Sequence, residues 1–186
     1  MEIDEKALEA MVEKRVQEIL DQKLEALIKA RLPKDRLSLI ASKGTMDMAY
    51  PPLILATSAV AMDMEAGIFF TFYGLDILHK KKNKNLKVPS VGNPAMPVPV
   101  PNIIGILPGM TAMATSMMKS WMAKQNVPTI PELLETAVES GVRLVGCQMT
   151  MDVMGVKKED LIDGVEVGGA AMFLDYAAEG KMTIFV

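Results

Sequence analysis

Short apolar runs alternate with helix-like segments through most of this chain, and this alternation restricts the fold more than any other feature. Strands are expected at residues 37–42, 68–72, 142–146, 165–167 and 181–186. Helices or helical turns are expected at residues 50–64, 74–82, 129–141, 150–154, 157–161 and 168–179. Apolar strands joined by helices form a parallel sheet that is covered on both faces. We therefore predict an α/β fold, a single three-layer domain with a four- to five-stranded, mostly parallel sheet flanked by helices.

Residues 1–35 precede the predicted α/β domain, which spans residues 36–186. A long amphipathic helix is expected over residues 1–32, and Pro33 ends it. Its apolar residues recur at spacings of three and four: Leu8, Val12, Val16, Ile19, Leu20, Leu24, Leu27, Ile28 and Leu32. Such a stripe needs a cover, either the following domain or the same helix of another subunit. The pattern leaves both open, because it falls short of a sustained heptad repeat.

Residues 83–108 form a Pro-rich excursion from the domain, and no charged residue occurs between Lys87 and Lys119. The uncharged run 103–118 is shorter than the roughly 20 residues of a membrane-spanning helix, and Pro108 interrupts it. We therefore expect no transmembrane span.

Two neighbouring segments suggest contact surfaces. A helix is expected over residues 110–122, with methionines along one side: Met110, Met113, Met117, Met118 and Met122. Methionine adapts to irregular apolar neighbours, so we interpret this side as an interface with a subunit or a partner. A lysine run precedes the excursion: Lys80, Lys81, Lys82, Lys84 and Lys87. It is expected to be a solvated face, with contact to an anionic membrane surface or an acidic partner as the alternative.

Composition narrows the classes of function. The chain has 186 residues with one Cys, one His and a net charge of -3. A single Cys excludes an intrachain disulfide and a zinc site built from cysteines. A single His makes a histidine-based metal site or a Ser-His catalytic triad improbable. Few aromatic residues and an acidic balance disfavour nucleic-acid binding. The acidic N-terminus does not resemble a secretory signal, so we expect a cytoplasmic location.

The single thiol is the strongest candidate for chemistry. Ligands of open parallel sheets bind at the carboxyl ends of the strands, and Cys147 directly follows the third predicted strand. It also precedes a predicted helical turn, whose N–H groups favour the thiolate. No Gly-x-Ser-x-Gly, Walker A or Gly-x-Gly-x-x-Gly motif competes with it. Position alone also allows the other role of a free Cys, that of a small buried hydrophobe.

Two segments resemble the DsrE/DsrF-like family. Residues 68–75 are similar to the family's second strand and turn, and residues 147–155 are similar to its cysteine segment. Residues 163–165 and 168–170 continue the pattern. The resemblance covers residues 37–186 and is greatest to a Met-rich subgroup, described as DsrE-like sulfurtransferases or as peroxiredoxin family proteins.

The resemblance implies a small α/β fold, homo- or hetero-oligomers and a role in intracellular sulfur trafficking. A cysteine of active members takes sulfane sulfur as a persulfide and passes it to a partner protein. That role would fall on Cys147, and the chain would act as a sulfur carrier or sulfurtransferase between donor and acceptor proteins. Some relatives carry a second cysteine, which this chain lacks, so disulfide chemistry within one chain is not implied.

Chemistry of this kind needs no metal and no cofactor. A carried persulfide is an anion, so a nearby cation and N–H groups would stabilise it. Lys43 and Gly44 follow the first predicted strand, Tyr73 follows the second, and Gln148 and Met149 follow the thiol. We name these five as candidate pocket or persulfide-stabilising residues. A solvated lysine and ordinary packing are the alternative interpretations.

Two other functions remain open at this point. One is a non-catalytic interaction subunit that docks a membrane or redox partner through its Met-rich apolar surface, with Cys147 merely buried. The other is a thiol peroxidase, which would need an external thiol to resolve a sulfenic acid. We also expect a homo-oligomer, since an uncharged surface of this extent is unusual on a monomer.

Overall fold

The computed structural model describes residues 5–89 and 109–186. It divides into two compact units, Met1–Pro33 and Lys34–Val186. The first unit holds one helix, α1 (Glu5–Arg31), so the predicted long helix is confirmed. Its apolar stripe is exposed, with Leu8, Val12 and Val16 each about half accessible. The predicted excursion lies outside the described residues from position 90 to 108.

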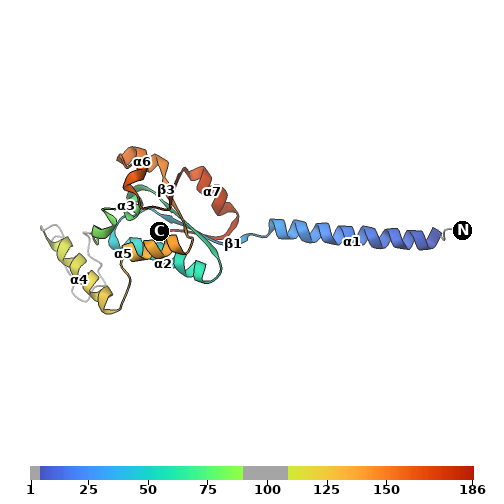
Figure 1. Ribbon diagram of the computed structural model, residues 1–186, viewed down its shortest axis with the longest axis horizontal. Coiled ribbons are helices and arrows are strands. Elements are labelled where there is room, and N and C mark those ends of the chain that lie inside the picture. The colour runs from blue at the N-terminus through green and yellow to red at the C-terminus, as the bar shows by residue number, and fades with distance from the viewer. Residues whose placement is uncertain (1–4, 90–108) are drawn as a thin grey trace. The chain divides into compact units, whose positions relative to one another are not determined.

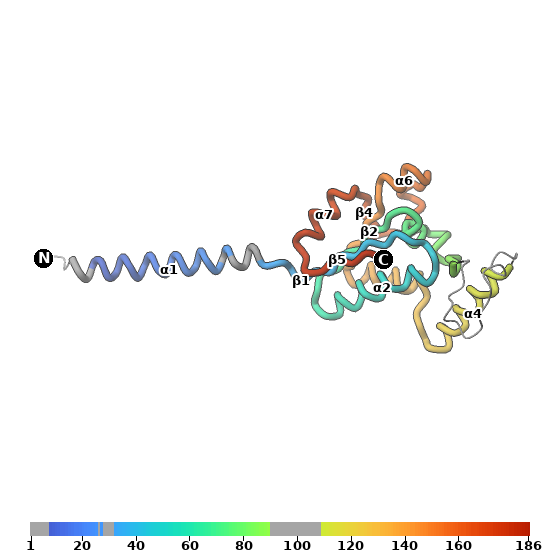
Figure 2. The backbone as a smooth tube through the Cα atoms, turned by 180° about the vertical axis from the view of Figure 1, so that it is seen from behind, coloured from blue at the N-terminus to red at the C-terminus, as the bar shows by residue number. Residues whose placement is uncertain are grey.

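The second unit is built on five parallel strands in the order β4-β3-β2-β1-β5. The strands are β1 (Lys34–Ala41), β2 (Glu65–Phe70), β3 (Arg143–Cys147), β4 (Val165–Gly168) and β5 (Gly180–Phe185). Figure 2 shows β5 beside β1 at one edge of the sheet. The α/β class, the parallel sheet and its flanking helices are as predicted.

Helices cover both faces of this sheet. Figure 1 shows α2 (Met46–Ala61) and α5 (Ile130–Glu139) on one side and α7 (Ala170–Ala178) on the other. Successive side chains of a strand point to opposite faces, so Ile68 packs toward α2 and α5 while Phe69 packs toward α7. The side chains of Ile68 and Phe69 are both nearly inaccessible to solvent. Burial on both faces explains why the central strands are apolar at almost every position.

A charged cluster holds α7 against the start of β1. The guanidinium of Arg36, 5% exposed, donates to the carboxylate of Glu65 and to the main-chain oxygen of Tyr176, both at 2.6 Å. It also lies 3.9 Å from the centre of the Tyr176 ring. This cluster keeps α7 on the face that carries Cys147.

The start of α2 differs from the prediction. The helix begins at Met46, four residues before the predicted start, so Pro51 and Pro52 lie inside it rather than in its first turn. Met46 is 1% exposed in the core, and its N–H donates to the main-chain oxygen of Lys87 at 2.8 Å. The helix therefore starts before the prolines, because Met46 packs in the core and its N–H is hydrogen-bonded.

The helix predicted over residues 74–82 is shorter than expected. A 3₁₀ turn, η1 (Phe72–Gly74), leads into one helical turn, α3 (Leu75–Leu78), and a second 3₁₀ turn, η2 (Asn83–Asn85), follows. His79 leaves the helix because it forms an isolated antiparallel bridge with Leu161. A long-range pairing thus overrides the local helical pattern.

The remaining helices are α4 (Met110–Lys124) and α6 (Gln148–Met154), with the 3₁₀ turn η4 (Lys158–Asp160) after α6. A capping box begins α5: the side chains of Thr129 and Glu132 each accept a hydrogen bond from the other residue's main-chain N–H. No helix in the described part of the chain has both the length and the apolar character that crossing a membrane requires.

The methionines of α4 do not form one common face. Met118 and Met122 pack against the core of their own domain, whereas Met113 and Met117 are 61% and 40% exposed. Between them Thr115 is buried and accepts a hydrogen bond from the N–H of Val88 at 3.2 Å. Two of the five methionines of the predicted interface, Met118 and Met122, therefore pack internally.

Candidate functional site

Cys147 is the last residue of β3 and the N-cap of α6. It lies at the carboxyl end of the strand, where the sequence places it, but its side chain is only 4% exposed. It packs with Phe69 and Val145 of the sheet and with Phe173 and Ala177 of α7. The free thiol is thus under the α7 layer rather than at an open strand end.

Two threonine hydroxyls adjoin the thiol. Thr150, in the first turn of α6, is 3% exposed, and its Oγ1 accepts a hydrogen bond from the N–H of Phe72 at 3.1 Å. The same oxygen lies 3.1 Å from Oγ1 of Thr71, with either hydroxyl able to donate. Thr71 follows β2, so this contact joins the ends of two neighbouring strands.

These groups determine the protonation of the thiol. Burial raises the pKa of Cys147, because desolvation disfavours the thiolate. Hydrogen bonds to the sulfur from Thr150, from the Thr71 hydroxyl and from the Met149 N–H oppose that effect. The hydrogen bonds prevail, and the pKa of Cys147 lies below the ordinary value of a cysteine thiol. A lowered pKa increases the fraction of the nucleophilic form.

Two glycines allow the ends of β1 and β2 to meet. A Cβ on Gly44 would lie 2.2 Å from the main-chain oxygen of Tyr73, and one on Gly74 would lie 2.1 Å from that of Ala41. Only a residue without a Cβ permits either approach. Between them Phe72 adopts φ 47, the left-handed region that a bulky residue rarely occupies.

The predicted site residues fall into two groups. Lys43, Gly44 and Tyr73 line one cavity of about 420 Å³, together with Thr45, Asp47, Met48, Asp76 and Pro89. Cys147, Gln148 and Met149 are not among the residues that line it. Among the described residues, the hydrogen-bonding groups at the sulfur do not include Lys43. The proposed role of Lys43 beside the sulfur therefore has no direct contact to support it.

The two residues after the thiol face outward. Gln148 donates through its side-chain amide to Asp152 at 2.8 Å, on the exposed side of α6. The side chain of Met149 is 61% exposed. Of these two residues, only Met149 is among the groups that lower the pKa of Cys147, and it acts through its main chain.

Sequence reasoning missed Thr71 and Thr150. Thr150 stands three residues after Cys147, which places it in the first turn of the helix whose N-cap is Cys147. From the sequence alone, that spacing could have predicted a hydroxyl near the sulfur of Cys147. The part played by Thr71 depends on the pairing of β2 with β3, which no local pattern reveals.

Comparison with known proteins supports a relationship over the whole α/β domain. The sequence model of the DsrE/DsrF/DrsH-like family matches residues 33–185. The sulfur carrier protein DsrE2 of Allochromatium vinosum is 44% identical over 161 residues, 83% of this chain and 100% of that protein. The uncharacterized protein YrkE of Bacillus subtilis is 34% identical over 154 residues, 81% of this chain and 96% of that protein.

Solved structures also align with the chain. The ychN protein from E. coli does so with a TM-score of 0.49 at 11% identity, covering 81% of this chain and 98% of that structure. A protein of unknown function from Methanobacterium thermoautotrophicum does so with a TM-score of 0.45 at 14% identity, over 81% and 98%. The matched family region begins where α1 ends and includes every strand of the sheet and the cysteine segment. On that match, the chain belongs to the DsrE/DsrF/DrsH-like family.

Proposed function

We propose that this protein is an intracellular sulfur-trafficking protein that holds sulfane sulfur as a persulfide on Cys147 and passes it to a partner protein. The observation that carries the proposal is the position of the thiol, at the carboxyl end of β3 and at the N-cap of α6, and the lowered pKa of Cys147 is consistent with it. A relative with 44% identity that is named a sulfur carrier supports the same role.

The transfer step uses the chemistry of the thiolate alone. The sulfur of Cys147 attacks the outer sulfur of a persulfide donor, a new S–S bond forms, and the donor leaves as its own thiolate. Two electrons move with the leaving group, so the exchange needs no external oxidant. The product is an anion, and Thr71, Thr150 and the Met149 N–H, the groups whose hydrogen bonding lowers the pKa of the thiol, would stabilise it.

Exposed apolar side chains on η1 and α6 suit contact with another protein. Phe72 and Tyr73 on η1 are 59% and 68% exposed, and Met149 and Val153 on α6 are 61% and 81% exposed. Both elements contribute groups that contact the sulfur or the Thr150 hydroxyl. A partner that covers this surface would be adjacent to the thiol and would exclude water from the exchange.

Intact-mass measurement tests the proposal. Purified protein is incubated with polysulfide or thiosulfate, desalted and weighed with and without dithiothreitol. We expect a gain of one sulfur atom that dithiothreitol removes, and no gain on Cys147→Ser. Absence of the adduct on the unmodified chain, or an equal adduct on Cys147→Ser, would rule the proposal out.

One observation favours a different function. A thiol that is 4% exposed also fits a non-catalytic interaction subunit, in which Cys147 is a core residue. Alkylation by iodoacetamide separates the two functions. A sulfur carrier reacts in its native state, whereas an interaction subunit reacts only after denaturation.

A further inference from the structure

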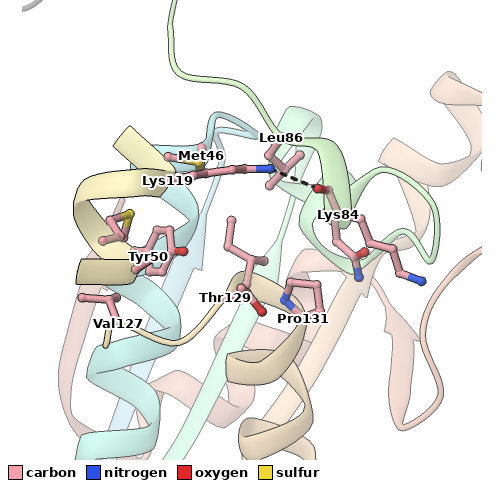
Figure 3. Close-up of a pocket in the computed structure, with 12 residues that line it drawn as sticks. Met46, Tyr50, Lys84, Leu86, Lys119, Val127, Thr129 and Pro131 are labelled. Atoms are coloured by element: carbon pink, nitrogen blue, oxygen red, sulfur yellow. Dashed lines mark hydrogen bonds between the residues drawn. The ribbon is translucent and has the colours of Figure 1, made fainter. Parts of the chain in front are cut away.

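The thiol is 4% exposed, so the sulfur donor of the proposed function needs a route to it. Cys147 lines neither of two cavities in the described part of the α/β domain. The cavity of about 330 Å³ in Figure 3, with Met46, Tyr50 and Pro131 in its lining, is on the sheet face opposite to that of Cys147. The other, of about 420 Å³, is beside Lys43 after the end of β1. An element that covers the sulfur therefore has to move before a donor reaches it.

Two of the elements beside the thiol are joined firmly to the rest of the domain. On η1, the N–H of Gly74 donates to the main-chain oxygen of Ser42 at 3.1 Å. The N–H of Phe72 on the same turn donates to the hydroxyl of Thr150. On α6, Thr150 and Met151 are nearly inaccessible, and Met151 belongs to the larger of the two core clusters. Displacing η1 or α6 would disrupt strand ends or that core.

The helix α7 is attached in a different way. Its inward side chains do not belong to the larger core. Phe173 and Ala177 instead form a small separate cluster with Phe69, Val145 and Cys147. Displacing α7 would expose the sulfur with the least loss of packing elsewhere in the domain.

The carboxyl end of α7 is clamped to the sheet. Arg36 and Arg143 lie over the ring of Tyr176, 3.9 and 4.9 Å from its centre. Arg36 also donates to the main-chain oxygen of Tyr176 at 2.6 Å and to the carboxylate of Glu179 at 3.1 Å. A Cβ on Gly67 would lie 2.6 Å from this ring, so the glycine lets the ring lie against β2. Stacked and charge-assisted contacts of this kind hold the end of the helix in place.

The amino end of α7 is held by less. Gly168 and Gly169 join it to β4, and no side chain caps the helix at Gly169. The first two helical residues, Ala170 and Ala171, are exposed, so the first side chain to contact the sheet side is that of Met172. Two glycines in succession leave the backbone free to rotate, as a hinge requires.

The two ends also lie at opposite edges of the sheet. Gly168 pairs with Cys147 at the carboxyl edge, where α7 begins. Figure 2 shows α7 running from there back toward the start of β1, where Arg36 meets Tyr176. The weakly held end of the helix is therefore the one beside the thiol.

We propose that α7 is a lid on Cys147 that remains attached at Tyr176 and opens at its Gly168–Gly169 end. Opening would lift Met172 and Phe173 away from the sulfur. The gap would face the carboxyl edge of the sheet, where ligands of such sheets bind. The purpose of the lid rests on the proposed function, since it would admit the sulfur donor and the partner.

Arg36 and Tyr176 are positioning residues in this scheme. They hold the attached end of the lid, and neither belongs to the groups that adjoin the sulfur. Local opening of this kind exposes far less surface than unfolding does, and this difference can be measured.

Alkylation of the native full-length chain by iodoacetamide tests for a lid. The rate is divided by the thiolate fraction, read from ultraviolet absorbance, and followed at urea concentrations below the unfolding transition. We expect a rate far below that of the unfolded chain, with a urea dependence less than about one third of that of global unfolding. A urea dependence equal to that of unfolding, or a rate equal to that of the unfolded chain, would overturn the proposal.

Substitutions along α7 distinguish a pivoting lid from a helix that detaches as a whole. Phe173→Leu removes the aromatic stack near the free end, so the corrected alkylation rate should rise about fivefold. Tyr176→Leu removes the ring contacts of the attached end. It should lower the urea midpoint of unfolding but change the alkylation rate less than about twofold, because the lid opens without breaking those contacts. An equal rise in both variants would show that the whole helix detaches, against the proposal.

The hinge allows a variant that favours the closed lid. Gly169 has φ -89 and ψ 170, which suit any residue, and the space for a Cβ is open. Gly169→Ser restricts the hinge and supplies an N-cap acceptor, so alkylation should slow about threefold. Ala178→Ser, exposed at the other end of the helix, is the matched control and should leave the rate unchanged. A rate for Gly169→Ser no lower than that of Ala178→Ser would contradict opening at this end.

No sulfur donor is present in these measurements, so the lid and the sulfur transfer fail separately. A sulfur adduct on Cys147 together with alkylation that follows global unfolding would overturn the lid alone. Alkylation with a weak urea dependence and no sulfur adduct would support the lid and rule out the transfer.

Discussion

At the scale of single residues, Cys147 combines burial with an acidic thiol. These properties oppose each other, because a buried group ordinarily resists ionisation. Thr150 reconciles them, since hydrogen bonding by its hydroxyl and its main chain lowers the pKa of the thiol. The chemistry of the site therefore depends on a residue that carries no charge and does not react.

Replacing Thr150 tests this dependence. Thr150→Val removes a donor to the thiolate and leaves the burial in place, so the pKa of Cys147 should rise by about one pH unit. The ultraviolet absorbance of the thiolate, followed against pH, measures it without requiring access to the sulfur. Thr150→Ser should keep the original titration, and Thr183→Val, on exposed β5, should not change it. Identical titrations of Thr150→Val and the unmodified chain would contradict the assignment.

At the scale of elements, α7 limits the access of solvent and reagents to the thiol. Gly168 on β4 is paired with Cys147, and a Cβ on Gly168 would lie 2.0 Å from the end of the Met172 side chain. Met172 therefore lies over the strand next to the sulfur. Phe173, one residue on, stacks on Phe69 with the ring centres 5.0 Å apart and holds the helix down.

Shortening Met172 should open this route. Met172→Ala removes a flexible cover and leaves the Phe173 stack, so the alkylation rate of native Cys147 should rise several-fold at fixed pH. The thiolate titration is measured in parallel, because a shorter side chain at 172 also lessens the burial that raises the pKa of Cys147. Leu174→Ala, 62% exposed on the same helix, is the control. If Met172→Ala is alkylated no faster than Leu174→Ala, an element other than the Met172 side chain limits access to the thiol.

At the scale of the whole molecule, two features with exposed apolar side chains suggest association. The helix α1 exposes a row of apolar side chains and lies outside the matched family region. The strand β5 is at the end of the sheet order, and its Met182 and Phe185 are 45% and 69% exposed. An apolar edge strand readily pairs with another chain.

Light scattering at micromolar concentration should therefore give a mass above the 20.3 kDa of one chain. Deletion of residues 1–33 identifies the feature responsible. Reversion to a monomer would assign association to α1, and an unchanged oligomer would assign it to the α/β domain. A monomeric full-length chain would contradict the expectation.

Local patterns determined much of this fold. The strands were predictable because residues such as Leu39 and Ile68 stand in apolar runs that only a sheet covered on both faces accommodates. The capping box at Thr129 was predictable because it requires two residues at a fixed spacing. The position of Cys147 after a strand was also predictable, because it depends only on the residues that precede Cys147 along the chain.

The tertiary structure determined the environment of the residues at those positions. Burial of Cys147 depends on α7, and its acidity depends on Thr150 with Thr71 from a neighbouring strand. The sequence by itself determined which elements form and where the thiol stands along the chain, because those properties follow from periodicity and capping. Which side chains lie beside the sulfur followed only from contacts between segments that are far apart in the sequence.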